Sequence, residues 1–231
     1  MSTISVVIPC YPPHFHHLAP LLERLKTQTL QPSEVIISAS QMSSDQASTL
    51  YEQLSSILTC PLSITSVIEP QPPGLNRNRG GDLATSTYIA FLDADDFYHS
   101  QKLALSVLLL DRTGADILVH SFHRRGTALT IRDQVIEVDT IAITSSETLL
   151  QKTFGNPPSR IGGERGHQGD TNIISGYEIH HGIPTIRREV LKEVRYTSMR
   201  CGEDGMFLRD ALFNHWKQVI AIPEKLMIYT S

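Results

Sequence analysis

The sequence predicts an α/β fold in which a mostly parallel central sheet is flanked by helices. Short apolar runs rich in β-branched residues alternate with amphipathic stretches through residues 5–92. Parallel strands joined by right-handed crossovers accommodate this order. The 231-residue chain is 40% hydrophobic, which is enough for one domain with its own core. Its apolar stretches are shorter than the roughly 18 residues that cross a membrane, so no transmembrane segment is expected.

The first part of the chain has a signal for each element. The expected strands are buried β-branched runs over residues 5–8, 34–37, 63–68 and 88–92. The first helix is indicated by four leucines at helical spacing, Leu18, Leu21, Leu22 and Leu25. Ser43 or Ser44 is available to cap the second helix. The three expected helices cover residues 18–25, 47–58 and 74–84.

The second part is less regular. It predicts a helix over 100–112, a strand over 116–120, an edge strand or hairpin arm over 132–138, a strand over 183–187, and helices over 188–193 and 205–216. Phe213 and Trp216 are expected to pack in the core or to cover the sheet. Residues 155–170 contain five glycines and two prolines. This stretch is interpreted as a mobile loop near a site, with a disordered segment as the alternative.

Composition excludes several classes of protein. The formal net charge of −4 argues against a nucleic-acid binder driven by bulk positive charge. Three cysteines without a CxxC pair exclude a zinc site built on cysteines and favour reduced thiols. The first residues lack the basic start and apolar run of a signal peptide. We therefore expect a cytoplasmic protein, free or peripheral at a membrane.

Three carboxylates follow the fourth expected strand. Asp93, Asp95 and Asp96 come directly after the buried run that ends at Leu92. Ligands of open α/β sheets bind beyond the carboxyl ends of the strands, and clustered carboxylates repel one another unless a cation or protons neutralise them. Oxygen ligands suit Mg²⁺ or Mn²⁺, especially beside a diphosphate. The cluster therefore indicates a metal site; alternatively, Asp95 or Asp96 caps the next helix.

Arginines and glycines open the third expected helix. Arg77 and Arg79 lie within the run from Gly74 to Gly81. Guanidinium groups beside a glycine-containing helix start can cradle phosphate oxygens. The alternative is a solvated loop with two surface arginines.

An acidic pair, Glu203 and Asp204, precedes the last expected helix. One of these carboxylates can act as a base that deprotonates a hydroxyl group. The alternative is a purely structural role, because acidic residues stabilise a helix N-terminus.

Taken in order, these motifs resemble the family 2 inverting glycosyltransferases of the GT-A fold. The segments that carry the resemblance are residues 5–11, 25–29, 32–37, 74–80, 88–96, 186–191 and 202–204. The resemblance implies a single GT-A (nucleotide-diphospho-sugar transferase-like) domain over residues 1–231. Residues 1–98 would form the nucleotide-sugar-binding half. Residues 99–231 would form the acceptor-binding half, with a mobile loop at about 155–172.

The resemblance also implies a reaction. A sugar would pass with inversion from a nucleotide-sugar donor, with UDP-sugars as the first candidates, to a hydroxyl group of a glycan or glycoconjugate. Asp93 and Asp95 would hold Mn²⁺ or Mg²⁺ on the donor's diphosphate. Asp204, the second acid of the pair with Glu203, would be the catalytic base.

Further site residues follow from the same resemblance. Contacts to the nucleotide sugar are expected from Pro9, Cys10, Tyr11, Ser38, Ser40, Gly74, Arg77, Asn78, Asp93 and Ala94. His181 and Gly182 are assigned to the acceptor or sugar pocket. Cys10 is expected to pack near the nucleotide and not to act as a nucleophile, because no base partner is apparent.

Two departures from the family pattern matter. The family usually has an acidic pair after the second strand that reads the nucleotide base; here Ser38 and Ser40 stand in that region, so the nucleotide stays open. Many relatives also end in a run whose histidine completes the metal shell. This sequence stops at Ser231, so that histidine is either absent or lies on a longer tail, and His180 and His181 are the nearest candidates within the sequence.

Two other functions compete with the glycosyltransferase. A GT-A-shaped nucleotidyltransferase would also use a carboxylate-bound metal, but residues 9–17 contain none of the Gly, Lys or Arg of its glycine-rich basic signature. A catalytically inactive nucleotide-sugar-binding module would keep the fold. The intact carboxylates at 93, 95, 203 and 204 argue against that alternative.

Overall fold

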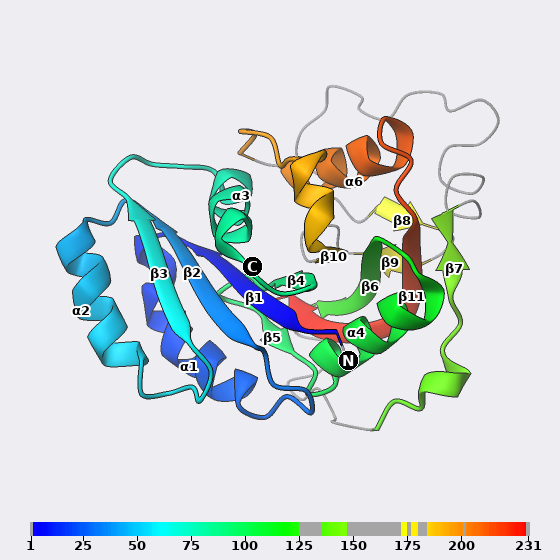
Figure 1. Ribbon diagram of the computed structural model, residues 1–231, viewed down its shortest axis with the longest axis horizontal. Coiled ribbons are helices and arrows are strands. Elements are labelled where there is room, and N and C mark those ends of the chain that lie inside the picture. The colour runs from blue at the N-terminus through cyan, green and yellow to red at the C-terminus, as the bar shows by residue number, and fades with distance from the viewer. Residues whose placement is uncertain are drawn as a thin grey trace.

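The protein is described by a computed structural model that covers residues 2–124, 135–146, 172–174, 177–179, 184–200 and 202–229. A central sheet lies between two layers of helices (Figure 1). The strand order is β3-β2-β1-β4-β10-β6-β11-β5. The predicted α/β class is confirmed.

The first four strands of the chain form the parallel part of the sheet. They are β1 (Ile4–Cys10), β2 (Glu34–Ser40), β3 (Leu62–Val67) and β4 (Tyr88–Phe91). β1 pairs in parallel with β2 and β4, and β2 pairs in parallel with β3. All residues of β1 and β4 are buried, because helices cover both faces of these strands.

Two helices cover one face of this parallel region (Figure 1). A 3-10 turn, η1 (Pro12–His14), leads into α1 (Phe15–Leu25), whose four leucines at the predicted spacing are all buried. α2 (Ser44–Leu54) begins at Ser43, which forms a capping box with Gln46 and thereby satisfies the first amide groups of the helix. The helix ends at Leu54, four residues before the expected end.

The third helix, α3 (Pro73–Leu83), covers the opposite face of the sheet. Gly80 makes this approach possible. A Cβ atom on Gly80 would lie 2.5 Å from Cγ1 of Val7 and 3.1 Å from Cβ of Ser38. The glycines that weaken the helix signal in the sequence therefore let α3 pack directly on β1 and β2.

The second half of the chain extends the sheet and adds the remaining helices. Its elements are β5 (Phe97–Tyr98), α4 (Lys102–Thr113), β6 (Ile117–Arg124), η2 (Val138–Thr140), β7 (Thr144–Ser145), β8 (Asn172–Ile174), β9 (Tyr177–Ile179), β10 (Thr185–Arg187), η3 (Arg188–Lys192), α6 (Glu203–Phe213) and β11 (Val219–Tyr229). β10 runs antiparallel to both of its neighbours, β4 and β6. The sheet is therefore mixed, and β10 joins its two halves.

Each face of the sheet has its own core. On one face, the buried leucines of α1 and α4 pack with β-strand residues such as Ile8 and Ile37. On the other face, Phe207 and Leu208 of α6 and Leu191 of η3 pack against Val7 and Phe91. This second core supports the residues of the candidate site.

Several expectations about the second half are wrong. The described part of the expected strand over 132–138 contains no strand, since residues 135–137 have no regular structure and Val138 begins η2. Both backbone polar groups of Ile136 bond instead to the side chain of Gln101. By contrast, the helix predicted over 188–193 is present as the 3-10 helix η3 (Arg188–Lys192). Trp216 lies beyond the end of α6 and is 75% exposed, so it covers neither the core nor the sheet.

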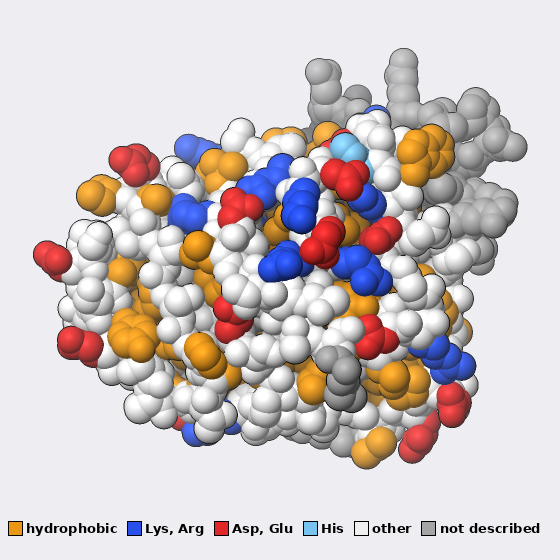
Figure 2. Space-filling model, in the orientation of Figure 1, with side chains coloured by type: hydrophobic (Ala, Val, Ile, Leu, Met, Phe, Trp, Pro, Cys, Tyr) orange, Lys and Arg blue, Asp and Glu red, His pale blue; other side chains and the backbone are white. Residues whose placement is uncertain are grey.

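The outer surface over α3, η3 and α6 carries charges of both signs. Figure 2 shows Lys and Arg side chains intermixed with Asp and Glu side chains on this face. Exposed ion pairs account for part of this pattern, among them Arg195 with Asp82 and Lys217 with Glu193. Within the described ranges, no helix is long and apolar enough to span a bilayer.

Candidate active site

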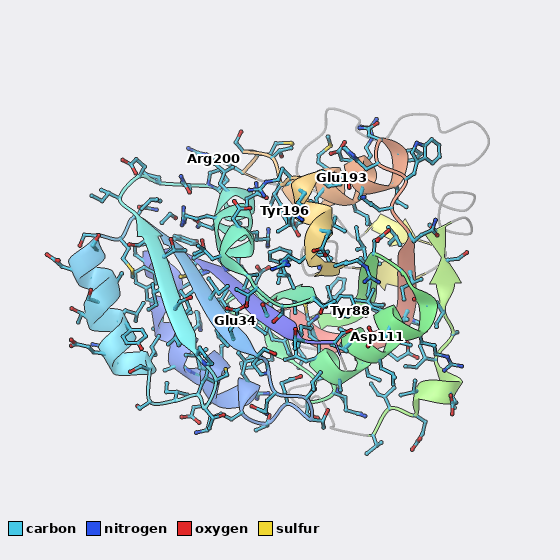
Figure 3. All side chains as sticks on the ribbon, in the orientation of Figure 1. Glu34, Tyr88, Asp111, Glu193, Tyr196 and Arg200 are labelled. Carbon is cyan, nitrogen blue, oxygen red and sulfur yellow. The ribbon has the colours of Figure 1, made fainter. Side chains whose placement is uncertain are left out.

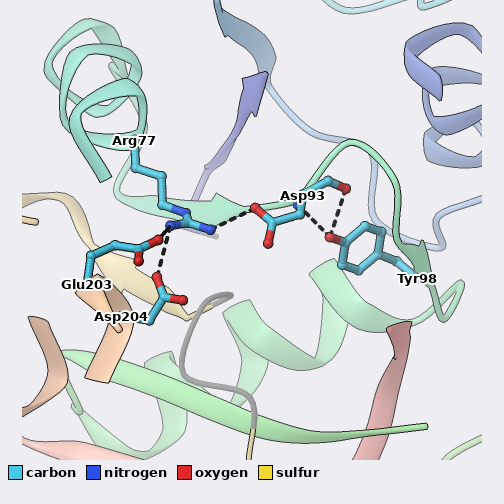
Figure 4. A network of polar contacts seen from close by, with 5 residues as sticks. All are labelled: Arg77, Asp93, Tyr98, Glu203 and Asp204. Atoms are coloured by element: carbon cyan, nitrogen blue, oxygen red, sulfur yellow. Dashed lines mark hydrogen bonds and ion pairs between the residues drawn. The ribbon is translucent and has the colours of Figure 1, made fainter. Parts of the chain in front are cut away.

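The acidic motifs of the two halves meet at one arginine. Arg77 of α3 bonds through Nη1 to Oε1 of Glu203 at 2.8 Å and to Oδ1 of Asp204 at 2.9 Å, and through Nη2 to Oδ1 of Asp93 at 2.8 Å (Figure 4). Asp93 follows β4, whereas Glu203 and Asp204 open α6. The fold therefore brings together three motifs that the sequence only suggested separately.

Gly74, at the start of α3, allows the close approach of these segments. A Cβ atom there would lie 2.8 Å from the carbonyl oxygen of Thr197, 2.9 Å from Cβ of Tyr196 and 3.1 Å from Cγ of Glu203. Any larger residue would push α3 away from the acidic pair. The structure thus gives Gly74 a packing role beside the site.

Tyr196 forms an aromatic wall beside Arg77 and lies between α3 and α6 (Figure 3). The guanidinium carbon of Arg77 is 5.4 Å from the Tyr196 ring centroid. The Tyr196 ring stacks on Phe207 at 4.2 Å, and it meets the edge of Phe91 at 5.4 Å. Asn78 fixes the backbone of Tyr196, since its amide donates to the Tyr196 carbonyl at 2.8 Å and accepts from the Tyr196 N–H at 3.0 Å.

The two acids of the pair have different surroundings. The side chain of Glu203 is 6% exposed and that of Asp204 is 20% exposed. Glu203 is therefore a buried counter-ion of Arg77, whereas Asp204 also reaches solvent. Both lie in the first turn of α6, whose N-cap is Gly202, so their charges also favour the helix N-terminus, as the structural alternative expects.

Electrostatics give Asp204 an unusual protonation equilibrium. Burial raises the pKa of Asp204 to about 7, opposed by Arg77 and reinforced by the charges of Glu203 and Asp93 and by a hydrogen bond with Glu203. Burial alone would lower the pKa of Arg77, but the surrounding carboxylates raise it well above its usual value. Arg77 therefore stays charged, and Asp204 exchanges protons near neutral pH.

Tyr98 holds the turn that carries Asp93. The backbone N–H of Asp93 donates to the Tyr98 hydroxyl at 2.6 Å, and that hydroxyl donates to the Asp93 carbonyl at 3.2 Å. The following helix, α4, has Gln101 as its N-cap, with no side-chain cap. Neither Asp95 nor Asp96 is therefore the N-cap of α4.

A buried lysine, Lys102, lies next to Tyr98. Lys102 is fully buried, and its Nζ hydrogen-bonds to Nε2 of His120. Burial lowers the pKa of Lys102 to about 7, although the charges of Asp96 and Asp93 favour its protonated form. No sequence pattern indicates this pair, because Lys102 stands at the start of an apolar helix pattern and His120 at the end of a strand pattern.

Comparison with known proteins identifies the family. The profile of "Glycosyl transferase family 2" matches residues 5–194. The chain belongs to glycosyl transferase family 2. This assignment confirms the family expected from the order of the motifs.

One curated relative of this family 2 chain is the amylovoran biosynthesis glycosyltransferase AmsB of Erwinia amylovora. The two are 39% identical over 112 residues, which is 48% of this chain and 36% of AmsB. The chain therefore spans about a third of the length of that relative.

Solved structures show the same fold. TarS of S. aureus superposes with a TM-score of 0.65 at 18% identity, over 99% of this chain and 37% of TarS. A shorter form, TarS 1–349 in complex with UDP-GlcNAc, gives 0.67 at 17% identity, over 99% of this chain and 58% of that form. Glucosyl-3-phosphoglycerate synthase of Mycobacterium tuberculosis, solved with Mn²⁺, UDP and glucosyl-3-phosphoglycerate, gives 0.54 at 16% identity, over 98% and 71%. The predicted GT-A fold is confirmed.

The residues expected to contact the nucleotide lie at the ends of β1 and β2. Pro9 and Cys10 end β1, and Tyr11 beyond them is 38% exposed. Burial raises the pKa of the Cys10 thiol to about 12, which is consistent with a packing role and not with a nucleophile. Ser38 and Ser40 are fully buried, so neither hydroxyl faces solvent in this conformation.

A polar network that sequence reasoning missed fixes this edge of the sheet. Nδ2 of Asn76 donates to the hydroxyl oxygen of Ser40 and to the carbonyl of Cys10, both at 3.2 Å. Nη2 of Arg79 donates to the carbonyl of Ala39 and to Oδ1 of Asn76, both at 2.6 Å. Arg79 thus bonds to protein groups at the end of β2. The only sequence feature that pointed to a role for Arg79 near the site is its place two residues after Arg77.

The chemistry of the acidic turn suits a divalent cation. Asp93 is partly exposed, and one of its oxygens bonds to Arg77. Mg²⁺ and Mn²⁺ are commonly held by one or two carboxylates together with phosphate oxygens of the substrate. Asp93 and Asp95 can supply the carboxylates, and a nucleoside diphosphate can supply the phosphate oxygens. Where the chain is described, no group of three or more His, Cys, Asp or Glu residues is arranged to hold an ion without such help.

The remaining predicted site residues are Ala94 and the residues expected at the acceptor or sugar pocket. Ala94, between Asp93 and Asp95, is buried. His180, His181 and Gly182 lie outside the described residues, as do residues 155–171 of the expected mobile loop. Their assignment to the acceptor or sugar pocket stays a prediction.

Proposed function

We propose that this chain transfers a sugar, with inversion, from a UDP-sugar to a hydroxyl group of a glycan or glycoconjugate. The observation that carries the proposal is the shared contact of Asp93 and Asp204 with Arg77. This contact sets a carboxylate suited to proton transfer beside the motif expected to hold the donor. One catalytic centre can therefore combine the two motifs.

Asp204 is proposed as the general base. Its carboxylate takes the proton of the acceptor hydroxyl while that oxygen attacks the anomeric carbon, on the face opposite the departing diphosphate. A single displacement of this kind inverts the anomeric configuration. A pKa raised to about 7 matches a base that works near neutral pH. Glu203 supports this role as the buried counter-ion that keeps Arg77 in place.

Asp93 and Asp95 are proposed to hold Mn²⁺ or Mg²⁺. A divalent cation bound there would stabilise the charge that develops on the leaving nucleoside diphosphate. The hydrogen bonds of Tyr98 to the Asp93 backbone keep the turn in one conformation. This prepares the carboxylates for the cation and lowers the cost of ordering them on binding.

The choice of a uridine donor is supported by the relatives. TarS was solved with UDP and with UDP-GlcNAc, and glucosyl-3-phosphoglycerate synthase with UDP and Mn²⁺. In this chain, the loop from Pro9 to Tyr11 is proposed to pack against the nucleotide base. Gly74, Arg77, Asn78 and Ala94 are proposed to shape the donor site around it.

The first experiment is calorimetric binding of UDP, GDP, CDP and dTDP, each with and without Mn²⁺. We expect binding of UDP that depends on Mn²⁺ and is lost in Asp95→Asn. UDP-sugars are then incubated with the enzyme, and the release of UDP and the anomer of the freed or transferred sugar are followed by NMR. We expect inversion, and loss of turnover in Asp204→Asn with UDP binding retained.

Other outcomes separate the competing functions. Binding of UDP without turnover of any sugar donor and acceptor would indicate an inactive binding module. Release of pyrophosphate from a nucleoside triphosphate and a sugar phosphate would indicate a nucleotidyltransferase. Full turnover in Asp204→Asn would contradict the proposed base.

A further inference from the structure

The guanidinium group of Arg77 has almost no contact with solvent. Its side chain is 3% exposed, and both terminal nitrogens bond to protein carboxylates. An arginine that grips a phosphate usually presents these same nitrogens to it as a fork. In this structure the fork is already filled by Asp93, Glu203 and Asp204.

The surroundings of Arg77 resist a change of position. Tyr196 packs beside the guanidinium, Phe207 stacks on that ring, and Asn78 holds the Tyr196 backbone from both sides. A swing toward the donor would break three charge-assisted hydrogen bonds. It would also leave the buried Glu203 without its cation, which is strongly unfavourable because the Glu203 side chain is only 6% exposed.

Resting on the proposed function, we propose that Arg77 is a positioning residue for the base Asp204 and not a ligand of the donor's diphosphate. Glu203 anchors the guanidinium, and Nη1 then fixes Oδ1 of Asp204 at 2.9 Å. Nη2 ties the same planar group to Asp93 of the donor motif. The side chain of Arg77 thus sets the distance between Asp93 of the donor motif and the base Asp204.

The test compares Arg77→Ala and Arg77→Lys with a matched control, Arg112→Ala. Arg112 also pairs with an aspartate, Asp139, but on the exposed surface of α4. We expect Arg77→Ala to lower kcat within the ~10²–10⁴-fold range of general-base catalysis, with the Kd for UDP and Mn²⁺ nearly unchanged. Added guanidinium at millimolar concentration should restore part of kcat to Arg77→Ala and none to Asp204→Asn. The control should behave as wild type.

A loss of UDP affinity of about tenfold or more in Arg77→Ala, with kcat retained, would make Arg77 a donor ligand and overturn the inference. If Arg77→Ala fails to fold, the kcat and UDP affinity of Arg77→Lys test the inference instead. Lysine keeps the charge but cannot span three carboxylates from one planar group. The positioning role therefore predicts an intermediate kcat with unchanged UDP affinity.

A second readout needs no turnover. The ¹³C carboxyl resonance of Asp204, assigned with Asp204→Asn, is titrated in the substrate-free protein. Arg77, Glu203, Asp93 and Tyr196 surround this carboxyl, so removal of the cation should raise its pKa above the wild-type value, and guanidinium should bring it back. An unchanged titration would overturn the inference. A raised pKa in a protein that transfers no sugar would retain it and reject the proposed function.

Discussion

The side-chain amide of Asn78 holds the backbone of Tyr196 from both sides, 118 residues further along the chain. One short side chain on α3 thereby satisfies a buried N–H and a buried carbonyl of the segment that leads to α6. This pair of hydrogen bonds links the helix that carries Arg77 to the segment that leads to Glu203 and Asp204. These two hydrogen bonds therefore help to hold the site in one conformation.

Replacement of Asn78 should therefore weaken the fold. Asn78→Ala leaves two buried backbone groups without partners, which costs about 1–3 kcal/mol each where water cannot reach them. We expect a loss of at least the lower figure in the free energy of unfolding, measured with urea. Asn214→Ala, at the exposed end of α6, is the control and should change stability by less than ~0.5 kcal/mol. Equal effects of the two variants would contradict this account.

Two adjacent glycines of α3 should differ in their tolerance of alanine. A Cβ atom on Gly80 meets Cγ1 of Val7 in the central strand, whereas a Cβ atom on Gly81 meets the terminal Cδ1 of Leu191. The stiff valine cannot move without shifting β1, but the leucine can adopt another rotamer. Gly80→Ala should therefore destabilise by ~1–3 kcal/mol and Gly81→Ala by clearly less. Thermal unfolding of both variants tests this, and the reverse order would disprove it.

Asp204 should make stability fall as the pH rises toward neutral. Its pKa is about 7 in the folded chain and near 3.8 when exposed. Between these values the folded state holds a proton that the unfolded state has released, so unfolding becomes easier as the pH increases from about 4 to about 7. Asp204→Asn should remove this decline, worth on the order of 1 kcal/mol or more. Parallel slopes for wild type and Asp204→Asn in urea titrations would rule it out.

Lys102 should have the opposite effect at higher pH. Burial lowers its pKa from 10.5 to about 7, so above neutral pH the unfolded chain binds a proton that the folded chain does not. Stability should therefore rise between about pH 7 and pH 10. Lys102→Met should remove this rise, whereas Lys26→Met, at an exposed lysine, should keep it. Melting temperatures measured from about pH 7 to pH 10 show whether each variant loses or keeps the rise in stability.

Much of the fold is predictable because its first half depends on local signals. Short β-branched runs and the leucine spacing of α1 are repeated patterns, and each element buries the residues that define it. The site motifs are also predictable in position, because polar residues that follow Phe91 must emerge at the end of a buried strand. The order of the motifs then indicated the family.

The rest depends on contacts between distant residues. No local pattern shows that Arg77 of α3 pairs with Glu203 and Asp204, or that Lys102 meets His120 inside the core. The long strand β11 was missed because Pro223, Glu224 and Lys225 interrupt its apolar run, and the pairing with β6 shifts register there. Trp216 was misplaced because α6 stops at Phe213.

The short strand β10 has a consequence for how this chain can change in length during evolution. Thr185 pairs with Ala90, and Ile186 pairs with Ile89, so β10 is registered directly against the strand that delivers Asp93. The chain then runs from β10 through η3 to Asp204. One added residue on that path would displace Asp204 by up to about 3 Å, the rise of one extended residue. Insertions between β10 and α6 would change this spacing, and we expect the chain to tolerate them poorly.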